Sequence, residues 1–170
     1  MVPANSVLIK NRSQVADTWH HLDDADPLPA NGAITVSWAR WTAERDTIGA
    51  RAPAELGVRI PNTLPTAEIG AEAGKFGLIA VSFPSFGDGR AFSQARVLRD
   101  RYDFKGELRA TGNVLRDQLQ ILQRCGVDAF ELPEKAIAED WLAAFDEYDL
   151  FYQPAEDNRP WIARQRQARG

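Results

Sequence analysis

Two loops that combine glycine, acidic and arginine residues carry the most suggestive chemistry in this chain. The first contains Asp88 and Arg90 within the run FGDGR, and the second, at residues 111–117, contains Asn113 and Arg116. The first turn of a helix offers unpaired backbone N–H groups to an anion, and an arginine there is unfavourable unless an anion or an acid balances it. We therefore expect a phosphate, sulfate, sulfite or carboxylate to bind these loops. The residues that would hold it are Ser85, Gly87, Gly89, Arg90, Asn113 and Arg116.

Both loops also allow a purely structural interpretation. Asp88 would cap one helix and pair with Arg90, and Asn113 would cap the next. Neither loop has the pattern GxxxxGK[ST] of a P-loop or GxGxxG of a dinucleotide-binding turn. Asp88 and Glu131 are the candidates for catalytic proton transfer, because both histidines of the chain lie near its N-terminus, outside the α/β region.

The sequence gives little support to metal or redox chemistry. Asp88, Asp117 and Glu131 could ligate magnesium, but they lack the spacing of a known site. The two histidines are adjacent and the chain has a single cysteine, so we predict no metal site and leave the cofactor open. That residue, Cys125, also excludes an internal disulfide and a CxxC pair. We interpret it as a buried residue at a helix C-terminus, where the dipole raises the pKa of a thiol.

The composition fits one domain with no general attraction for polyanions. The chain has 170 residues, of which 44% are hydrophobic and 26% charged, which is enough for one full core. Its formal net charge of -4 provides no positive field to hold nucleic acid. The N-terminus lacks the pattern of a signal peptide, and no long apolar run occurs. We therefore expect a cytoplasmic protein that binds neither nucleic acid nor membrane.

Short β-branched or aromatic runs alternate with helical patterns from residue 34 onward. Strands are predicted at residues 34–37, 57–60, 78–83, 107–111, 128–132 and 151–153, and helices at 39–50, 67–75, 91–102, 114–125 and 136–148. The apolar run 78–83 is typical of a strand buried on both faces, so it should be central. The alternation predicts an α/β fold with a mostly parallel sheet of about five to six strands, either an open three-layer sheet or an incomplete barrel.

The two ends of the chain differ from this core. Residues 7–10 and 14–16 predict a small hairpin, within an N-terminal hairpin-and-loop region at 1–32 of a single domain at 1–155. Residues 156–170 form a basic tail that we expect to be mobile or ordered against a partner. Exposed tryptophan near arginine is typical of interface anchors, although each end could instead fold back over a sheet edge. The candidate partner-binding residues are Trp19, Trp161 and Arg164.

Several phrases of the sequence are together similar to one bacterial family. They are RWTAERD at 40–46, AVSFPSFGDGRAFSQARVLRDRY at 80–102, GELRATGNVLRDQL at 106–119 and RCGVDAFEL at 124–132. Through them the chain resembles the bacterial family of unknown function numbered 934, from the N-terminal hairpin to about residue 153. The resemblance implies a link to sulfur assimilation, because genes of that family commonly lie beside those for assimilatory sulfite or nitrite reductase and phosphoadenylyl-sulfate reductase. Many members are labelled oxidoreductases in sulfite reduction.

Two functions follow as hypotheses. The first is a non-catalytic accessory protein of assimilatory sulfite or sulfate reduction, which docks on a sulfite or nitrite reductase or on its electron donor. The second is a small α/β enzyme acting on an anionic metabolite, with Arg90 and Arg116 holding the anion and Asp88 or Glu131 moving protons. We prefer the first, because the resemblance points to it and the sequence lacks redox motifs.

Overall fold

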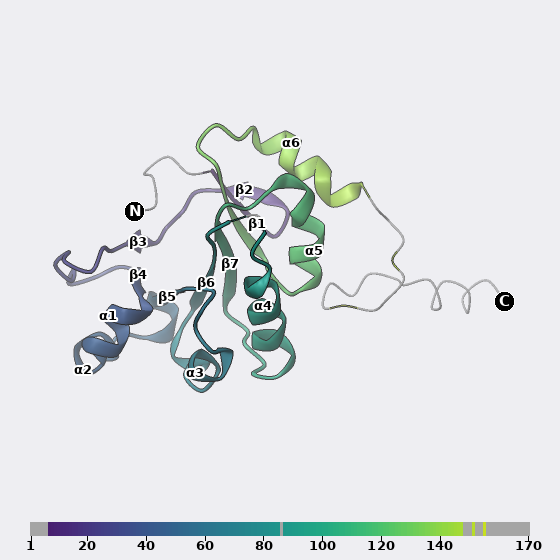
Figure 1. Cartoon of the computed structure of the whole chain (residues 1–170). Coiled ribbons are helices and arrows are strands. Elements are labelled where there is room, and N and C mark those ends of the chain that lie inside the picture. Colours follow the sequence, from purple (N-terminus) through teal and green to yellow (C-terminus); the bar gives the residue numbers. More distant parts are fainter. Residues whose placement is uncertain (1–6, 86, 148–150, 152–154, 156–170) are drawn as a thin grey trace.

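The fold is a curled eight-stranded sheet with short helices packed against it, as the computed structural model shows (Figure 1). The structure describes residues 7–85, 87–147, 151 and 155. The strands are β1 (Val7–Lys10), β2 (Ser13–Val15), β3 (His20–His21), β4 (Ile34–Ser37), β5 (Leu56–Ile60), β6 (Leu78–Phe83), β7 (Glu107–Gly112) and β8 (Ala129–Leu132). The α-helices are α1 (Trp38–Ala43), α2 (Arg45–Ile48), α3 (Thr66–Gly70), α4 (Arg90–Asp100), α5 (Leu119–Arg124) and α6 (Ala138–Ala143). Short 3-10 helices are η1 (Pro53–Glu55), η2 (Ala73–Lys75), η3 (Arg116–Gln118) and η4 (Ala144–Asp146).

The strand order confirms an α/β fold and extends the predicted sheet. The order is β2-β1-β8-β7-β6-β5-β4-β3, so β3 to β8 are neighbours in chain order and pair in parallel. The predicted five to six mostly parallel strands were too few, since the N-terminal hairpin joins the sheet through antiparallel pairing of β1 with β8. The two-residue β3 was also missed, because so short a strand has no readable period.

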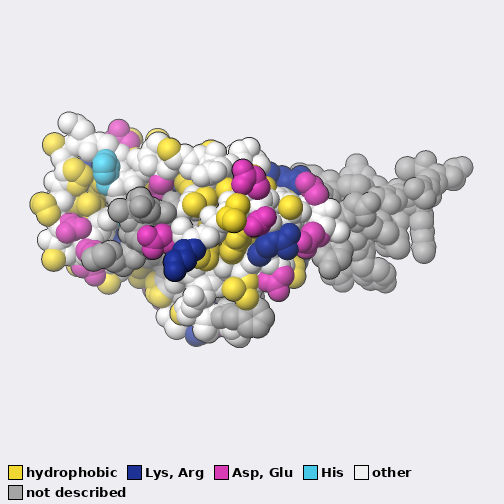
Figure 2. All heavy atoms as spheres, turned by 90° about the horizontal axis from the view of Figure 1, so that it is seen from above, with side chains coloured by type: hydrophobic (Ala, Val, Ile, Leu, Met, Phe, Trp, Pro, Cys, Tyr) yellow, Lys and Arg dark blue, Asp and Glu magenta, His cyan; other side chains and the backbone are white. Residues whose placement is uncertain are grey.

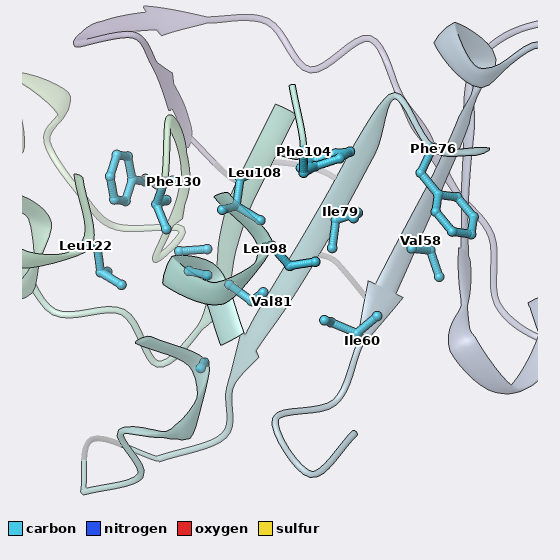
Figure 3. Packing of buried hydrophobic residues seen from close by; sticks show 14 of the residues in the cluster. Val58, Ile60, Phe76, Ile79, Val81, Leu98, Phe104, Leu108, Leu122 and Phe130 are labelled. Carbon is cyan, nitrogen blue, oxygen red and sulfur yellow. The ribbon is translucent and has the colours of Figure 1, made fainter. Parts of the chain in front are cut away.

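The two faces of the sheet have different chemistry. Successive residues of a strand point to opposite faces, and one set, including Val58, Ile79 and Leu108, packs with the helices into the apolar core (Figure 3). The alternate set carries Thr35, Arg59, Arg109 and Glu131, among other residues. We call this second surface the inner face. Crossover connections between parallel strands are right-handed. Because each connection here leads to the next strand in the same direction across the sheet, the described helices all lie on one side, and the inner face is free of them.

The sheet curls toward its inner face. His21 on β3 and Glu131 on β8 are five strand intervals apart in the sheet order, which in a flat sheet would be about 24 Å. Yet their side-chain ligand atoms, together with those of Asp17, all lie within 4.8 Å of one another. The sheet is therefore a curled, open one, closer to the incomplete barrel than to the flat three-layer alternative.

A four-residue segment joins the two edges of this curled sheet. Residues 16–19, which we call the strap, connect the end of β2 at one edge to the start of β3 at the other. Extended backbone over that length reaches at most about 18 Å, whereas seven flat strand intervals would span about 34 Å. The strap can therefore exist only because the edges curl toward each other.

Several element boundaries differ from the sequence prediction. The helix predicted at 39–50 is divided into α1 and α2 at Glu44, whose backbone N–H still bonds to Arg40 O while its own dihedral angles leave the helical range. The helix predicted at 114–125 begins with the 3-10 turn η3, and that at 136–148 ends in η4. Of the strand predicted at 151–153, only Phe151 lies among the described residues. No helix in the described part of the chain is long and apolar enough to cross a membrane.

Candidate functional site

The first predicted loop is held by a local ion pair. Asp88 accepts hydrogen bonds from the backbone N–H of Arg90 at 3.3 Å and from its guanidinium Nε at 2.9 Å, with Nη2 at 2.5 Å. The hydrogen bond from Arg90 is the main reason why the pKa of Asp88 lies well below its usual value. Gly89 occupies the N-cap of α4, and Ser85 and Gly87 are exposed. An anion at this loop would thus compete with Asp88 for Arg90.

The second predicted loop lies beside the first, but its arginine turns to another element. The Asn113 backbone N–H donates to Phe83 O at 2.7 Å, and its side-chain amide donates to Pro84 O at 2.8 Å. Arg116 instead donates to Asp140 O at 2.6 Å and pairs with Glu147 at 2.6 Å. The loops therefore adjoin through Asn113, while the guanidinium of Arg116 holds α6.

The remaining predicted residues are dispersed. Trp19 is half-buried in the strap, and Trp161 and Arg164 lie outside the described residues. Cys125 is a free, half-buried thiol whose pKa is raised, chiefly by burial. Glu131 lies on the inner face, where it meets a residue that the sequence analysis did not single out.

That residue is Arg109, at the centre of a charged group on the inner face. Its side chain is 1% exposed and bonds three carboxylates: Nε donates to Glu107 at 2.7 Å, and Nη1 donates to Asp17 at 2.5 Å and to Glu131 at 3.1 Å. His21 joins through Asp17, with Nε2 2.9 Å from Oδ2. We call these five residues the Arg109 cluster. Three strands and the strap converge on it: Glu107 and Arg109 lie on β7, Glu131 on β8 and His21 on β3.

The hydrogen bonds continue from His21 toward the centre of the sheet. His21 Nδ1 is 2.8 Å from the hydroxyl of Thr35, a fully buried residue of β4. The same hydroxyl accepts a 2.8 Å bond from Arg59 on β5. At the other end Lys10 on β1 donates to Glu107 at 2.7 Å. The inner face thus carries one network in which the carboxylates of Asp17, Glu107 and Glu131 face the cations Lys10, Arg59 and Arg109.

Small residues next to the arginines make room for this network. In the register of the sheet, Arg59 pairs with Ala80, Ala80 with Arg109, and Arg109 with Ala129. Gly57 lies on the same face, where an added Cβ would come within 2.9 Å of the Thr35 methyl group. The alternation of arginine with alanine or glycine therefore lets two guanidinium groups fit inside one curled sheet.

Hydrogen bonds and opposite charges within the Arg109 cluster stabilise the ionised forms of Asp17 and Arg109. Burial alone would raise the pKa of Asp17, but hydrogen bonds from His21, Arg109 and the Trp19 backbone outweigh it, and the pKa is lowered. Burial alone would lower the pKa of Arg109, but its bond to Asp17 and the charges of Glu107 and Glu131 raise it. Because Asp17 is ionised it can only accept, so His21 Nε2 carries a hydrogen. Asp17 and Arg109 therefore both stay charged.

Asp17, His21 and Glu131 also have the donor chemistry of a divalent-metal site. Arg109 Nη1, however, bonds to both Asp17 Oδ2 and Glu131 Oε1, so a guanidinium already takes the place of the cation between the two carboxylates. A metal ion would have to displace a side chain that is 1% exposed. The geometry therefore favours a guanidinium-centred cluster, and the expectation of no metal site remains a prediction.

The sequence contained one signal for this cluster. Within the predicted strand ELRAT, Glu107 and Arg109 have opposite charges two residues apart, so they must share a face of the sheet. An apolar strand that carries two charges on one face predicts a polar inner surface. Nothing in the local sequence predicted the partnership of Arg109 with Asp17, which lies 92 residues earlier in the chain.

Comparison with known protein families assigns the chain to one of them. The profile of the family described as "Bacterial protein of unknown function (DUF934)" matches residues 57–162. The chain belongs to this family. Arg59, Arg109 and Glu131 of this DUF934 member lie within the matched residues, whereas Asp17 and His21 precede them. Neither the curated proteins nor the solved structures with which the chain was compared gave a match.

Proposed function

We propose that this DUF934 member is a non-catalytic accessory protein of assimilatory sulfite or sulfate reduction that docks on a reductase or on its electron donor. The gene neighbourhood implied by the resemblance suggests the pathway. The single cysteine argues against a dithiol redox role for the chain itself. In the Arg109 cluster the charged groups bond to one another, which stabilises the inner face of the sheet.

The observation that carries the docking proposal is the exposure of large apolar side chains on neighbouring elements, which we call the docking corner. Among the described residues, four large apolar side chains are exposed, and three of them belong to the region of η3, α5 and α6: Leu115 at 39%, Ile121 at 57% and Ile137 at 59%. The fourth, Val15, is on the edge strand β2. Clustered apolar exposure is typical of protein-binding surfaces.

The corner is a coherent surface because hydrogen bonds fix its helices together. Arg116 of η3 bonds to Asp140 O and Glu147, and Gln120 of α5 donates to Phe145 O at 3.0 Å. Helices α5 and α6 accordingly lie side by side in Figure 1. Seen from the side of α6, hydrophobic side chains are interspersed with acidic and basic ones (Figure 2). Docking surfaces likewise combine apolar contacts with polar and charged side chains.

A binding experiment with purified proteins tests this proposal. Wild type is expected to form a complex with the sulfite reductase hemoprotein or its electron donor at about 10 µM. The double variant Ile121→Ser/Ile137→Ser should weaken it about tenfold or more, since buried interface anchors each contribute at least about 1 kcal/mol. Val15→Ser, a matched loss of an exposed apolar side chain elsewhere, should leave binding unchanged. No complex with either protein at that concentration would refute the proposal.

A second function, a small enzyme acting on an anionic metabolite, is favoured by the contact of the two predicted loops through Asn113. In that case Arg90, whose side chain is 58% exposed, would leave Asp88 and bind the anion. Thermal unfolding with sulfite, sulfate or a phosphorylated metabolite tests it. The anion should stabilise wild type and an Arg96→Ala control but not Arg90→Ala. Equal stabilisation of all three would exclude the loop as the binding site.

A further inference from the structure

We propose that the space between Arg109 and His21 is a binding site for a small oxyanion, and that Asp17 occupies it as an internal ligand. The site lies on the inner face, away from the docking corner and from the loop at Arg90. The proposal is independent of the docking function.

The donors around Asp17 form a receptor for a two-oxygen anion. Arg109 presents Nη1 to Asp17 Oδ2 at 2.5 Å and Nη2 to Oδ1 at 3.3 Å, and His21 Nε2 lies 2.9 Å from Oδ2. The planar fork of a guanidinium matches the oxygens of a carboxylate, sulfate or phosphate in the same way. The groups that bind the carboxylate of Asp17 would therefore bind a free oxyanion with the same geometry.

Asp17 is the member of the Arg109 cluster most easily removed from it. Glu107 and Glu131 belong to strands, and their side chains are 5% and 8% exposed. Asp17 belongs to the strap, which is neither helix nor strand, and its side chain is 19% exposed. Its neighbours Ala16 and Thr18 are exposed. The strap can thus move Asp17 out without breaking a strand, and solvent already reaches the site from that side.

The donors that Asp17 satisfies show what would replace it. Without Asp17, the Arg109 guanidinium loses one of its three carboxylate partners, and His21 Nε2 loses its acceptor. A buried donor that is left without an acceptor is costly in a low-dielectric interior. An oxyanion supplies acceptor oxygens to both side chains, which a metal cation cannot do.

Removal of the internal ligand provides the test. In Asp17→Ala, formate, sulfate and phosphate should each be tried against chloride at equal ionic strength, with thermal unfolding and calorimetry as readouts. An internal ligand that is in place in nine molecules of ten lowers the apparent affinity for a competitor about tenfold. We therefore expect at least one of these oxyanions to bind Asp17→Ala about tenfold or more tighter than wild type. Formate reports a planar carboxylate ligand, and sulfate and phosphate report a tetrahedral one.

One control variant and one folding criterion make every outcome decisive. Asp46→Ala removes an exposed acid from α2 and causes the same change in net charge, so it should respond to oxyanions as wild type does. If Asp17→Ala does not fold in chloride, folding on addition of an oxyanion supports the proposal, and failure to fold in all salts overturns it. A folded Asp17→Ala whose response equals that of Asp46→Ala also overturns it.

Hydrogen exchange of the wild type gives an independent readout. The backbone N–H of Trp19 donates to Asp17 Oδ1 at 3.0 Å, so it loses this acceptor when the Asp17 side chain rotates out of the cluster. An oxyanion that displaces Asp17 should accelerate exchange of that amide, relative to the amide of His20, which donates to Ala33 O. Unchanged exchange at an oxyanion concentration that saturates Asp17→Ala would show that Asp17 is not displaced.

Discussion

At the scale of single residues, Arg109 is the side chain on which most of the polar interior depends. It bonds carboxylates from the strap, from its own strand and from β8. A buried ion pair adds little net stability over a well-packed apolar pair, because desolvation offsets much of the attraction. Loss of the cation alone is different, since it leaves buried carboxylates with no counter-charge.

We therefore predict that Arg109→Met destabilises the protein by about 3–5 kcal/mol, measured as the free energy of unfolding in urea. The change removes the shared partner of Asp17, Glu107 and Glu131. The control Arg96→Met breaks an exposed pair with Asp100 and should cost less than about 1 kcal/mol. Similar losses in both variants would contradict a central role for Arg109.

The loss of folding stability at acid pH should also depend on Asp17. Its pKa is lowered in the folded state, so the unfolded chain binds the proton more readily, and stability must fall as the pH falls. The contribution is complete above about pH 5 and is lost progressively below about pH 4, the ordinary pKa of the unfolded carboxyl. Urea unfolding between about pH 7 and pH 3 should show a shallower acid loss for Asp17→Asn than for wild type. Parallel curves would rule out Asp17 as the source.

At the scale of elements, the ends of β6 and β7 depend on a glycine. Gly112 has φ +88°, and an added Cβ would lie 2.6 Å from Phe83 O, the acceptor of the Asn113 backbone N–H. A side chain here would both strain the backbone and push apart the two strand ends. Gly87, in the neighbouring loop, has open space around its Cβ position.

The two glycines make a matched pair of variants. Gly112→Ala should destabilise the protein by about 1–3 kcal/mol, because the positive φ and the close carbonyl both oppose a Cβ. Gly87→Ala should change stability by less than about 1 kcal/mol. Thermal or urea unfolding of both measures the difference. A cost at Gly87 equal to that at Gly112 would argue against the conformational explanation.

The sequence predicted these elements far better than it predicted the site they form. Apolar strands between amphipathic helices were recognisable because the core residues repeat with the period of each element, as in Val58 and Ile60 or Ala95 and Leu98. The edge pairing of β1 with β8 was not recognisable from the sequence. It joins segments about 120 residues apart through backbone groups that every sequence has. The Arg109 cluster depends on the same long-range closure.

At the scale of the whole molecule, one apolar core runs from the first strand to the last described helices. It includes Ile9 on β1 and Phe145 in η4, and Phe145 packs against Phe130 of β8 with ring centroids 5.6 Å apart. On the other side of the sheet, the polar network ties the N-terminal hairpin and the strap to β7 and β8. Neither end of the described chain has a core of its own.

We therefore predict a single cooperative unfolding transition. Tryptophan fluorescence, with reporters that include Trp19 in the strap and Trp141 in α6, should follow the same urea curve as far-UV circular dichroism. The common core and the shared network leave no part that could unfold alone with a separate midpoint. Two resolved midpoints would show that the N-terminal region is a separate unit.

The strap has a consequence for the order in which the protein can be built. Asp17 leaves the ribosome 92 residues before Arg109, and Lys10 leaves it 97 residues before Glu107. At usual bacterial and eukaryotic synthesis rates, the N-terminal segment waits about 5–20 s for its partners. Contacts so distant in sequence also slow folding after release. The part of the chain that is made first is thus among the last to be fixed, and a nascent chain stalled before β7 would carry an unpaired hairpin and an unanchored strap.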